Sequence, residues 1–218
     1  TVNNILNRYG CISPEESQKR QPFTRFEKEL CNQMWQVDFK GEFRMEDGRY
    51  CYPLDIMDDH SRFAIRVVPH LRTSYVVIPV FKQAFQEFGL PDSILSDNGA
   101  QFAGFRKEYT QFEEWLMNHN ILPIHGRIKH PQTQGKIERF HRTLKQELLN
   151  HNIFTNINDA DAALQNWRMK YNNIRPHEAL NMKCPAEVYK PSDRTYIDKV
   201  EKYEYGGQHH IIKVNSWG

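Results

Sequence analysis

The sequence predicts an α/β fold in which an antiparallel meander and two parallel strands form a five-stranded mixed sheet flanked by helices. The first observation is a set of three strand-like segments joined by short turns. The second is that two further strand-like segments alternate with long segments of helical periodicity. Strands joined by short turns pair antiparallel, whereas strands separated by helices add to a sheet in parallel.

The meander begins where the chain changes from polar and mixed-charge sequence to strand periodicity. Trp35, Val37 and Phe39 alternate with polar residues, which is the two-residue period of a strand. Turn-forming residues at 46–49 and 58–60 separate the segments that follow. We therefore expect the three antiparallel strands at Trp35–Phe39, Tyr50–Met57 and Phe63–Val68.

The second half of the chain carries the helices and the two parallel strands. In the helix expected from about residue 134, Ile137, Phe140, Leu144 and Leu148 fall in one stripe about 80° wide, which should pack on the sheet. The expected elements are helix Ser74–Phe88, strand Ser93–Ser96, helix Phe105–Asn118, strand Ile121–Ile124, and helices Gln134–Leu149 and Ala160–Tyr171.

Three regions are expected along the chain. Residues 1–30 are polar and interrupted by prolines, so we interpret them as a linker from an N-terminal domain that lies outside this sequence. Residues 31–190 contain the predicted α/β core. Residues 191–218 include two strand-like segments around Gly206-Gly207, which indicate a tail or the start of a small C-terminal β module.

Composition excludes several classes of protein. The 218 residues contain 29 Lys and Arg against 27 Asp and Glu, a net charge of +2 that does not by itself indicate a nucleic-acid partner. The longest apolar run is far shorter than the roughly 18 residues of a membrane span, so no membrane association is expected. The four cysteines show no zinc-binding spacing, and the absence of a signal peptide favours a reducing intracellular compartment.

Three acidic residues lie in contexts that differ from ordinary surface acids. Asp38 is in the middle of a strand, Asp97 follows the C-terminal end of another, and Glu138 lies in a helix. Each alone has a structural explanation: an edge-strand acid, a turn-forming residue, and a solvated residue paired with Arg142 one turn later. Ligand sites in α/β sheets form at the carboxyl ends of strands, which favours a functional role for Asp97.

The sequence around these acids resembles the three catalytic motifs of the retroviral integrase superfamily, and particularly the integrase-like (DDE) transposases of bacterial insertion sequences. The resemblance covers about residues 33–190 and includes two further segments, Tyr171–His177 and Pro185–Tyr189. It implies an RNase H-like fold with Asp38, Asp97 and Glu138 as a catalytic triad that binds two Mg²⁺ or Mn²⁺ ions when DNA is bound. The motifs are Trp35–Phe39, Leu95–Phe102 and His130–Arg142.

The spacing of the motifs departs from the family in one place. Forty residues separate Asp97 from Glu138, about five more than is usual, and we expect a longer connection around Ala103–Gln111 to contain the excess. The retroviral type of N-terminal zinc domain is also absent from this sequence. The bacterial branch implies a helix-turn-helix DNA-binding domain upstream of Thr1 instead.

The resemblance implies metal-dependent cleavage of DNA ends and their transfer into target DNA by a transposase, which is a polynucleotidyl transferase. In-line displacement at phosphorus suits two divalent ions held by carboxylates, with no protein nucleophile. The alternatives are an RNase H-like nuclease without strand transfer and a non-catalytic DNA-binding derivative. The implied partners are element ends, target DNA and further copies of the chain on DNA, in the bacterial cytoplasm at the nucleoid.

Positive charge gathers around the third motif. The segment His125–His151 contains six Lys and Arg residues against two acids, although a solvated basic face is the alternative to DNA contact. We interpret His125, His130 and His141 as helix-end and phosphate contacts, and Asp58-Asp59 as a turn rather than metal ligands. The expected DNA-binding residues are Gln134, Lys136, Arg139, Arg142, Lys145, Arg127 and Lys129.

Overall fold

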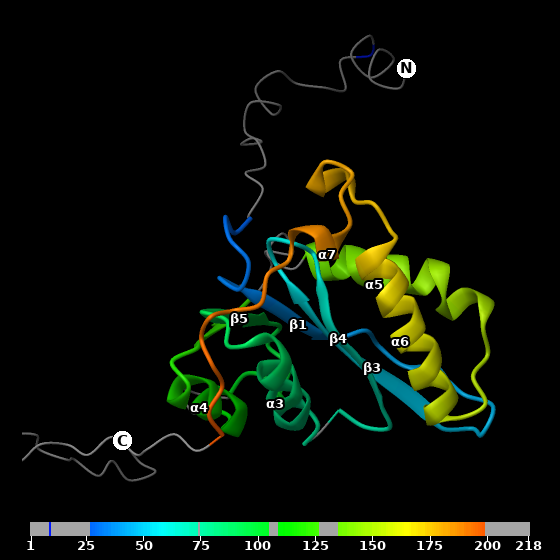
Figure 1. Ribbon diagram of the computed structural model, residues 1–218. Helices are drawn as coiled ribbons and strands as arrows, with labels where there is room; N and C mark the ends of the chain where they lie inside the picture. The colour runs from blue at the N-terminus through cyan, green and yellow to red at the C-terminus, as the bar shows by residue number, and fades with distance from the viewer. Residues whose placement is uncertain (1–8, 10–26, 74, 105–108, 127–134, 199–218) are drawn as a thin grey trace, which may run out of the picture.

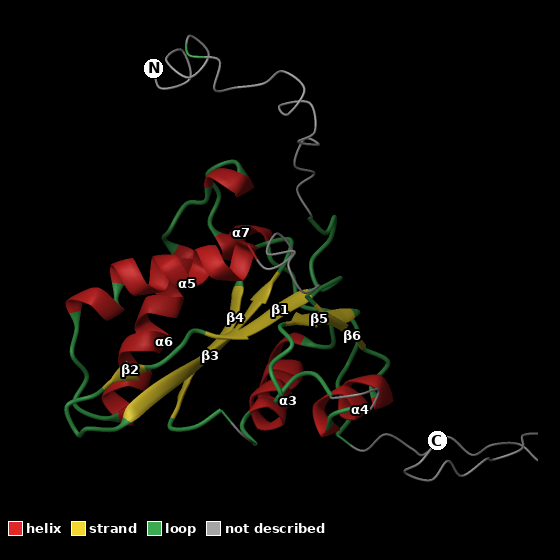
Figure 2. Cartoon of the chain, turned by 180° about the vertical axis from the view of Figure 1, so that it is seen from behind, coloured by secondary structure: helices red, strands yellow, loops and turns green. Residues whose placement is uncertain are grey.

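The computed structural model describes residues 9, 27–73, 75–104, 109–126 and 135–198 (Figure 1). A twisted sheet forms the centre, with α3 and α4 on one face and α5 and α6 on the other (Figures 1 and 2). The strands are β1 Trp35–Phe39, β2 Phe43–Arg44, β3 Tyr50–Asp58, β4 Ala64–His70, β5 Ser93–Ser96 and β6 Leu122–His125. The helices are α3 Val77–Phe88, α4 Gln111–Asn118, α5 Gly135–Glu147, α6 Ile157–Asn173 and α7 Pro185–Val188, with 3₁₀ turns η2 Leu149–His151 and η3 Glu178–Leu180.

The sheet has the predicted mixed topology. Its main strands lie in the order β4-β3-β1-β5-β6, and the two-residue β2 pairs with the beginning of β3. The pairs β1–β3 and β3–β4 are antiparallel, whereas β1–β5 and β5–β6 are parallel. Both parts of the prediction, the meander and the two parallel additions, are therefore confirmed.

The register of β1 positions the first two acids. On one side, Asp38 lies opposite Asp55 of β3 in the antiparallel pairing. On the other side, Gln36 pairs in parallel with Leu95 of β5. Two residues further along these parallel strands come Asp38 and Asp97, so the register carries both carboxylates to the same end of the sheet.

Apolar packing on the two faces of the sheet fixes the helices. On the first face, Trp35 of β1 and Phe81 and Phe85 of α3 are fully buried in one cluster with α4. On the second face, Phe140 of α5 is buried against Trp167 of α6. The stripe predicted for α5 is confirmed, since Ile137, Phe140 and Leu144 are buried and Leu148 packs at the edge of the cluster.

The start of α4 differs from the prediction. The helix begins at Gln111 rather than Phe105, because Thr110 forms its N-cap. The Thr110 hydroxyl accepts a hydrogen bond from the backbone N–H of Glu113, and the Glu113 carboxylate accepts one from the backbone N–H of Thr110. Residues 105–108 of the longer connection expected around Ala103–Gln111 lie outside the described residues, and its described parts, 103–104 and 109–110, are not helical.

The C-terminal part of the described chain packs back on the core. The backbone N–H of Ser192 donates to the carbonyl of Phe88, and that of Leu90 donates to the carbonyl of Arg194. Gly89 makes this possible, because its φ is +76° and a Cβ there would lie 2.6 Å from the Ser192 carbonyl oxygen. The domain boundary at residue 190 remains a prediction, and the strands expected around Gly206 lie outside the described residues.

Most of the predicted linker also lies outside the described part of the chain, which resumes at residue 27. Among the helices that the structure describes, none is long and apolar enough to cross a membrane.

Candidate active site

Asp38 and Asp97 form the centre of the candidate site. Both are half-buried, at the end of β1 and directly after β5. Burial raises the pKa of Asp38 from 3.8 to about 6; the positive field of His141 opposes this shift, and the charges of Asp97 and Asp55 add to it. The two carboxylates are therefore close enough to repel each other, an arrangement that a divalent cation would relieve.

The turn after β5 holds Asp97 by local hydrogen bonds. The backbone N–H of Gly99 donates to Oδ1 of Asp97 at 2.9 Å, which closes an Asx-type turn. The side-chain amide of Asn98 donates to the carbonyl of Gly126 at 2.8 Å. The Asp97 turn is thus fastened to the residue that follows β6.

A partly buried chain of hydrogen-bonded side chains, the Ser96–His125–Glu113 relay, supports the same edge of the sheet. The Ser96 hydroxyl lies 3.0 Å from Nδ1 of His125, and Nε2 of His125 lies 2.8 Å from Oε1 of Glu113. Burial alone would raise the pKa of Glu113, but hydrogen bonds from Thr110, His125 and Gly104 outweigh it and lower the pKa. Ser96 is only 2% exposed, so this relay is a support beneath Asp97. We expected His125 at a phosphate; its ring faces Ser96 and Glu113 instead.

Glu138 lies on α5, which packs on the second face of the sheet. It is exposed in the first turn of α5, between the buried Ile137 and Phe140. Within the described residues it makes no ion pair with Arg142, so the simple structural explanation for this pair of residues does not apply. The described part of the chain also holds no group of three His, Cys, Asp or Glu side chains arranged to bind a metal. The structure therefore brings two of the three predicted ligands together.

His141 lies between Asp38 and a second buried acid that sequence reasoning missed. Its Nε2 is 2.9 Å from Oδ2 of Asp55, and its Nδ1 is 3.8 Å from Oδ2 of Asp38. Asp55 is fully buried; its contact with His141 has the distance of an ion pair but not the geometry of a hydrogen bond, and neither carboxylate oxygen accepts a hydrogen bond from the described residues. The available signal was an acid between Leu54 and Ile56, in the apolar middle of the strand.

Asp58 has the structural role expected of a turn. Its carboxylate accepts hydrogen bonds from the backbone N–H and hydroxyl of Ser61, at 2.8 and 2.6 Å, and from the backbone N–H of Asn32 at 2.7 Å. Burial raises the pKa of Asp58, and these hydrogen bonds oppose the shift. Its oxygens are taken up by protein donors, which favours the turn over a metal-binding role.

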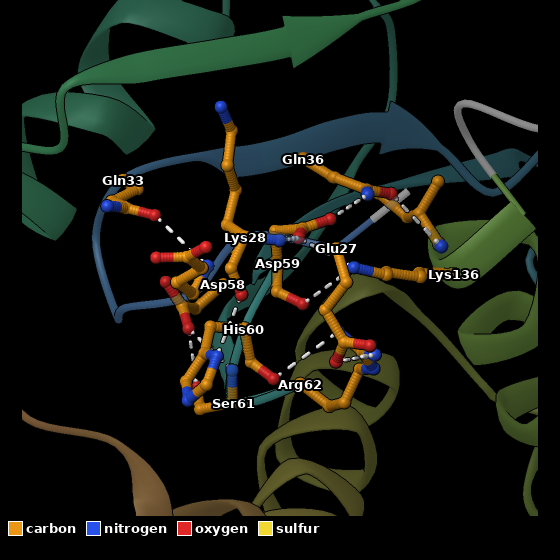
Figure 3. Close-up of polar contacts among 12 residues, drawn as sticks. Glu27, Lys28, Gln33, Gln36, Asp58, Asp59, His60, Ser61, Arg62 and Lys136 are labelled. Atoms are coloured by element: carbon orange, nitrogen blue, oxygen red, sulfur yellow. Dashed lines mark hydrogen bonds and ion pairs between the residues drawn. The ribbon is translucent and has the colours of Figure 1, made fainter. Parts of the chain in front are cut away.

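Lys136 differs from the expectation that it faces DNA. Its Nζ lies 2.6 Å from Oδ2 of the fully buried Asp59, and its side chain is 13% exposed (Figure 3). Burial lowers the pKa of Lys136, and the hydrogen bond to Asp59 opposes this shift. The ammonium group is therefore directed into the protein.

Sequence comparison identifies the family. Two family models, both described as "Integrase core domain", match residues 29–131 and 119–185. The chain belongs to the integrase core domain family. The two models together span β1, β5 and α5, the elements that carry the three predicted ligands.

Proteins of bacterial insertion elements are among the relatives of this integrase core domain. An uncharacterized IS407 protein of Burkholderia multivorans is 28% identical over 157 residues, which are 72% of this chain and 54% of that protein. An uncharacterized IS476 protein of Xanthomonas euvesicatoria is 29% identical over 157 residues, covering 72% of this chain and 44% of that protein. The chain thus spans about half the length of these curated relatives.

Solved structures show the same fold. The integrase catalytic core of HTLV-2, described in complex with magnesium, matches with a TM-score of 0.57 and 20% identity, over 75% of this chain and 100% of that one. A chain of the simian T-cell lymphotropic virus intasome matches with a TM-score of 0.65 and 19% identity, over 85% of this chain and 64% of that one. The RNase H-like integrase fold is therefore established for this domain.

The donor set of this integrase core domain fits a hard divalent cation. Asp38 and Asp97 offer only carboxylate oxygens, which Mg²⁺ and Mn²⁺ prefer. The pKa of Asp38 is raised mainly by burial and further by the nearby charge of Asp97, and a bound cation would oppose both effects. Glu138 would complete the set from α5.

Three of the predicted DNA contacts lie on the outer face of α5. Arg139, Arg142 and Lys145 are all exposed on this helix. Gln134, Arg127 and Lys129 lie outside the described residues. Within the described part of the chain, none of these three cations forms an ion pair with Glu138.

Proposed function

We propose that this chain is the catalytic core of a DDE transposase that cleaves DNA ends and joins them to target DNA. The observation that carries the proposal is the pair formed by Asp38 and Asp97, brought together by the parallel register of β1 and β5. Glu138 projects from the helix packed on the same sheet. The insertion-element relatives support a transposase, and the integrase fold supports polynucleotidyl transfer.

Asp38, Asp97 and Glu138 would hold the metal in this proposal. Two bound Mg²⁺ or Mn²⁺ ions would activate the attacking water or 3′-hydroxyl and stabilise the leaving oxygen. Asp38 must lose its proton to act as a ligand, and its pKa of about 6 leaves it mostly ionised near neutral pH. Arg139, Arg142 and Lys145 would position DNA phosphates beside the three acids.

The proposed partners are element ends, target DNA and further copies of the chain. One structural neighbour is described as an intasome, which supports assembly of this chain into a homo-oligomer on DNA. The bacterial relatives support a place at the nucleoid in the cytoplasm.

The test is the activity of Asp38→Asn, Asp97→Asn and Glu138→Gln on DNA that ends in the element's terminal sequence. Each variant should lose metal-dependent cleavage by about a thousandfold or more, because several kcal/mol of charge stabilisation disappear from the transition state. Glu114→Gln, an exposed acid on α4, is the matched control and should keep full activity. Retained activity in any triad variant would remove that residue from the site.

The same assay separates the alternatives when cleaved and joined products are measured independently. Cleavage without joined product would assign the chain to the RNase H-like nucleases. DNA binding with neither product, at any concentration of Mg²⁺ or Mn²⁺, would assign it to non-catalytic DNA-binding derivatives.

A further inference from the structure

A network of buried polar side chains connects strand β1 to the beginning of α5. Asp59 is fully buried, and its Oδ1 accepts a hydrogen bond from Nε2 of Gln36 at 2.7 Å. Its Oδ2 receives Nζ of Lys136 at 2.6 Å, and its backbone carbonyl receives the same ammonium at 3.1 Å. Figure 3 shows Gln36 and Lys136 converging on Asp59 from β1 and α5.

Gln36 extends the network to the helix backbone. Its Oε1 accepts a hydrogen bond from the backbone N–H of Ile137 at 3.3 Å. The first N–H groups of a helix have no partner within the helix, so Gln36 acts as a cap supplied by the sheet. Among the described residues, every hydrogen bond that joins the first turn of α5 to another element runs to Gln36 or Asp59.

The charges of the network also suit the end of a helix. A cation in the first turn opposes the helix dipole, so Lys136 gains nothing from its own helix. The Asp59 carboxylate compensates, because it places a negative charge beside the N-terminal end of α5. This pairing explains why a lysine lies in the first turn with its ammonium directed inward.

The positions of these residues link two of the proposed metal ligands. Gln36 lies two residues before Asp38 on β1, and Lys136 lies two residues before Glu138 on α5. Asp59 is itself fixed to the start of β1, since its backbone N–H donates to the carbonyl of Met34 at 2.9 Å. The network therefore determines where the first turn of α5 lies relative to the strand of Asp38.

We propose that Gln36, Asp59 and Lys136 are positioning residues that hold Glu138 in place relative to Asp38. This inference rests on the proposed function, in which both acids bind the same metal ions. Asp59 and Lys136 act through the position of α5 and touch neither metal nor DNA.

Two other roles for these residues fit the contacts less well. If Lys136 moved to a DNA phosphate, the fully buried carboxylate of Asp59 would lose its charged partner, which is strongly unfavourable. If Asp59 were a metal ligand, it would have free oxygens; however, Oδ2 also accepts the backbone N–H of Lys28 at 2.8 Å. Both observations favour a permanent structural pair.

The experiment compares Lys136→Met, Asp59→Asn and the double variant with the original chain. DNA-end cleavage is followed across a Mn²⁺ series, and hydrogen exchange is measured over residues 135–142. Each single variant should raise the Mn²⁺ concentration for half-maximal cleavage roughly 10- to 100-fold, as loss of supporting contacts around metal ligands usually does. The double variant should need no more Mn²⁺ for half-maximal cleavage than the more impaired of the two single variants, because both changes break the same contact.

Lys145→Met is the matched control, since it removes an exposed cation from the same helix. It should weaken DNA binding while leaving Mn²⁺ dependence and exchange over 135–142 unchanged. Lys136→Gln keeps a donor for Asp59 and should recover part of the Mn²⁺ affinity lost in Lys136→Met. This conservative variant also keeps the test decisive if Asp59→Asn fails to fold.

The inference is overturned if Lys136→Met behaves like Lys145→Met, losing DNA affinity with unchanged Mn²⁺ dependence. It is also overturned if the two single effects multiply in the double variant. Failure of the proposed function has a different signature: the original chain would show no metal-dependent cleavage. In that case hydrogen exchange alone tests the positioning role. Lys136→Met should still increase exchange in the first turn of α5, and unchanged exchange there would overturn the inference.

Discussion

The strand side and the helix side of the candidate site are built in different ways. Asp38 lies near the end of β1 and Asp97 directly follows the neighbouring parallel strand β5, so backbone hydrogen bonds fix their spacing. Glu138 lies on α5, which is joined to the sheet by apolar packing and by the side chains of Gln36 and Asp59. Side-chain substitutions can therefore displace the third acid much more easily than the first two.

The two sides also differ in electrostatic cost. Asp38 is half-buried and its pKa is raised to about 6, so its ionised form destabilises the metal-free protein. Glu138 is exposed to solvent on the outer side of α5. Stability and function therefore oppose each other mainly on the strand side.

The largest expected effect is on the helix side, from Phe140→Ala. Phe140 is 2% exposed and contacts the rings of Trp167 and Tyr171, at centroid distances of 5.2 and 4.9 Å. Its removal should cost about 3–5 kcal/mol of unfolding free energy, measured by urea denaturation. Phe81→Ala on the opposite face should cost a similar amount but leave hydrogen exchange in α5 unchanged. Equal hydrogen exchange in α5 in the two variants would show that α5 does not depend more on its own apolar packing than on the opposite face of the sheet.

The next effect has the opposite sign and belongs to the strand side. The folded pKa of Asp38 exceeds its unfolded value of 3.8, so its contribution to stability falls as pH rises from about 4 to about 6. Asp38→Asn should therefore stabilise the metal-free chain by up to about 3 kcal/mol at pH 8 and by little at pH 4. Thermal unfolding at both pH values measures this.

Metal provides the control for Asp38→Asn. Saturating Mn²⁺ should stabilise the original chain more than the variant, because a ligand that binds the folded state shifts the unfolding equilibrium. An Asn variant that is less stable at pH 8 without metal would show that the Asp38 charge carries no cost.

A smaller loss is expected from Glu113→Gln, which breaks the relay beneath Asp97. Oε2 of Glu113 accepts hydrogen bonds from Gly104 and Thr110, and Oε1 pairs with His125, whereas an amide offers only one accepting oxygen. Chemical denaturation should show a loss of about 1–2 kcal/mol at pH 7.

The pH dependence of Glu113→Gln provides an internal check. The folded pKa of Glu113 is lowered, so its contribution is present above the unfolded value of 4.5 and disappears as pH falls through the folded value. The difference in unfolding free energy between Glu113→Gln and the original chain should therefore become smaller at acidic pH. Glu114→Gln, the exposed neighbouring acid, is the control, and an equal loss there would contradict the role of the relay.

The smallest effect on stability is expected from Arg142→Ala combined with Lys145→Ala. Both side chains are exposed, so unfolding free energy should change by less than about 0.5 kcal/mol. DNA binding should weaken, and the slope of log affinity against log salt concentration should decrease by the equivalent of up to about two released counter-ions. The Mn²⁺ affinity should stay unchanged. Lys82→Ala on α3 is the control on the opposite face. Unchanged DNA affinity in the double variant would exclude phosphate contacts from the outer face of α5.

Local patterns in the sequence predict most of the fold. The two-residue period of Trp35–Phe39 and the apolar stripe of α5 each follow from one segment alone. The late start of α4 was also readable, since Thr110 and Glu113 have the spacing of a capping box. To predict that Asp38 and Asp97 lie close together, it was enough to predict that their two strands are parallel neighbours.

Those local patterns could not predict the buried charge pairs. Lys136 and Asp59 are 77 residues apart, and His141 meets Asp55 from a different element. Periodicity indicates which face of an element is buried, but it does not identify the side chain on the other element. A buried charge therefore looks like a surface charge until the elements are assembled.

The return of residues 189–198 to the core determines where the next part of the chain begins. Tyr189 stacks on Phe63 with 4.4 Å between ring centroids, and Arg194 donates to the carbonyls of Pro91 and Asn120. The segment ends beside α4, on the other side of the sheet from α5 and α6 (Figures 1 and 2). A module attached after residue 198 thus starts from a fixed anchor, with a tether about 26 Å shorter than one released at residue 190. That shorter tether confines such a module to a smaller volume and raises its effective concentration near the α4 end of the domain.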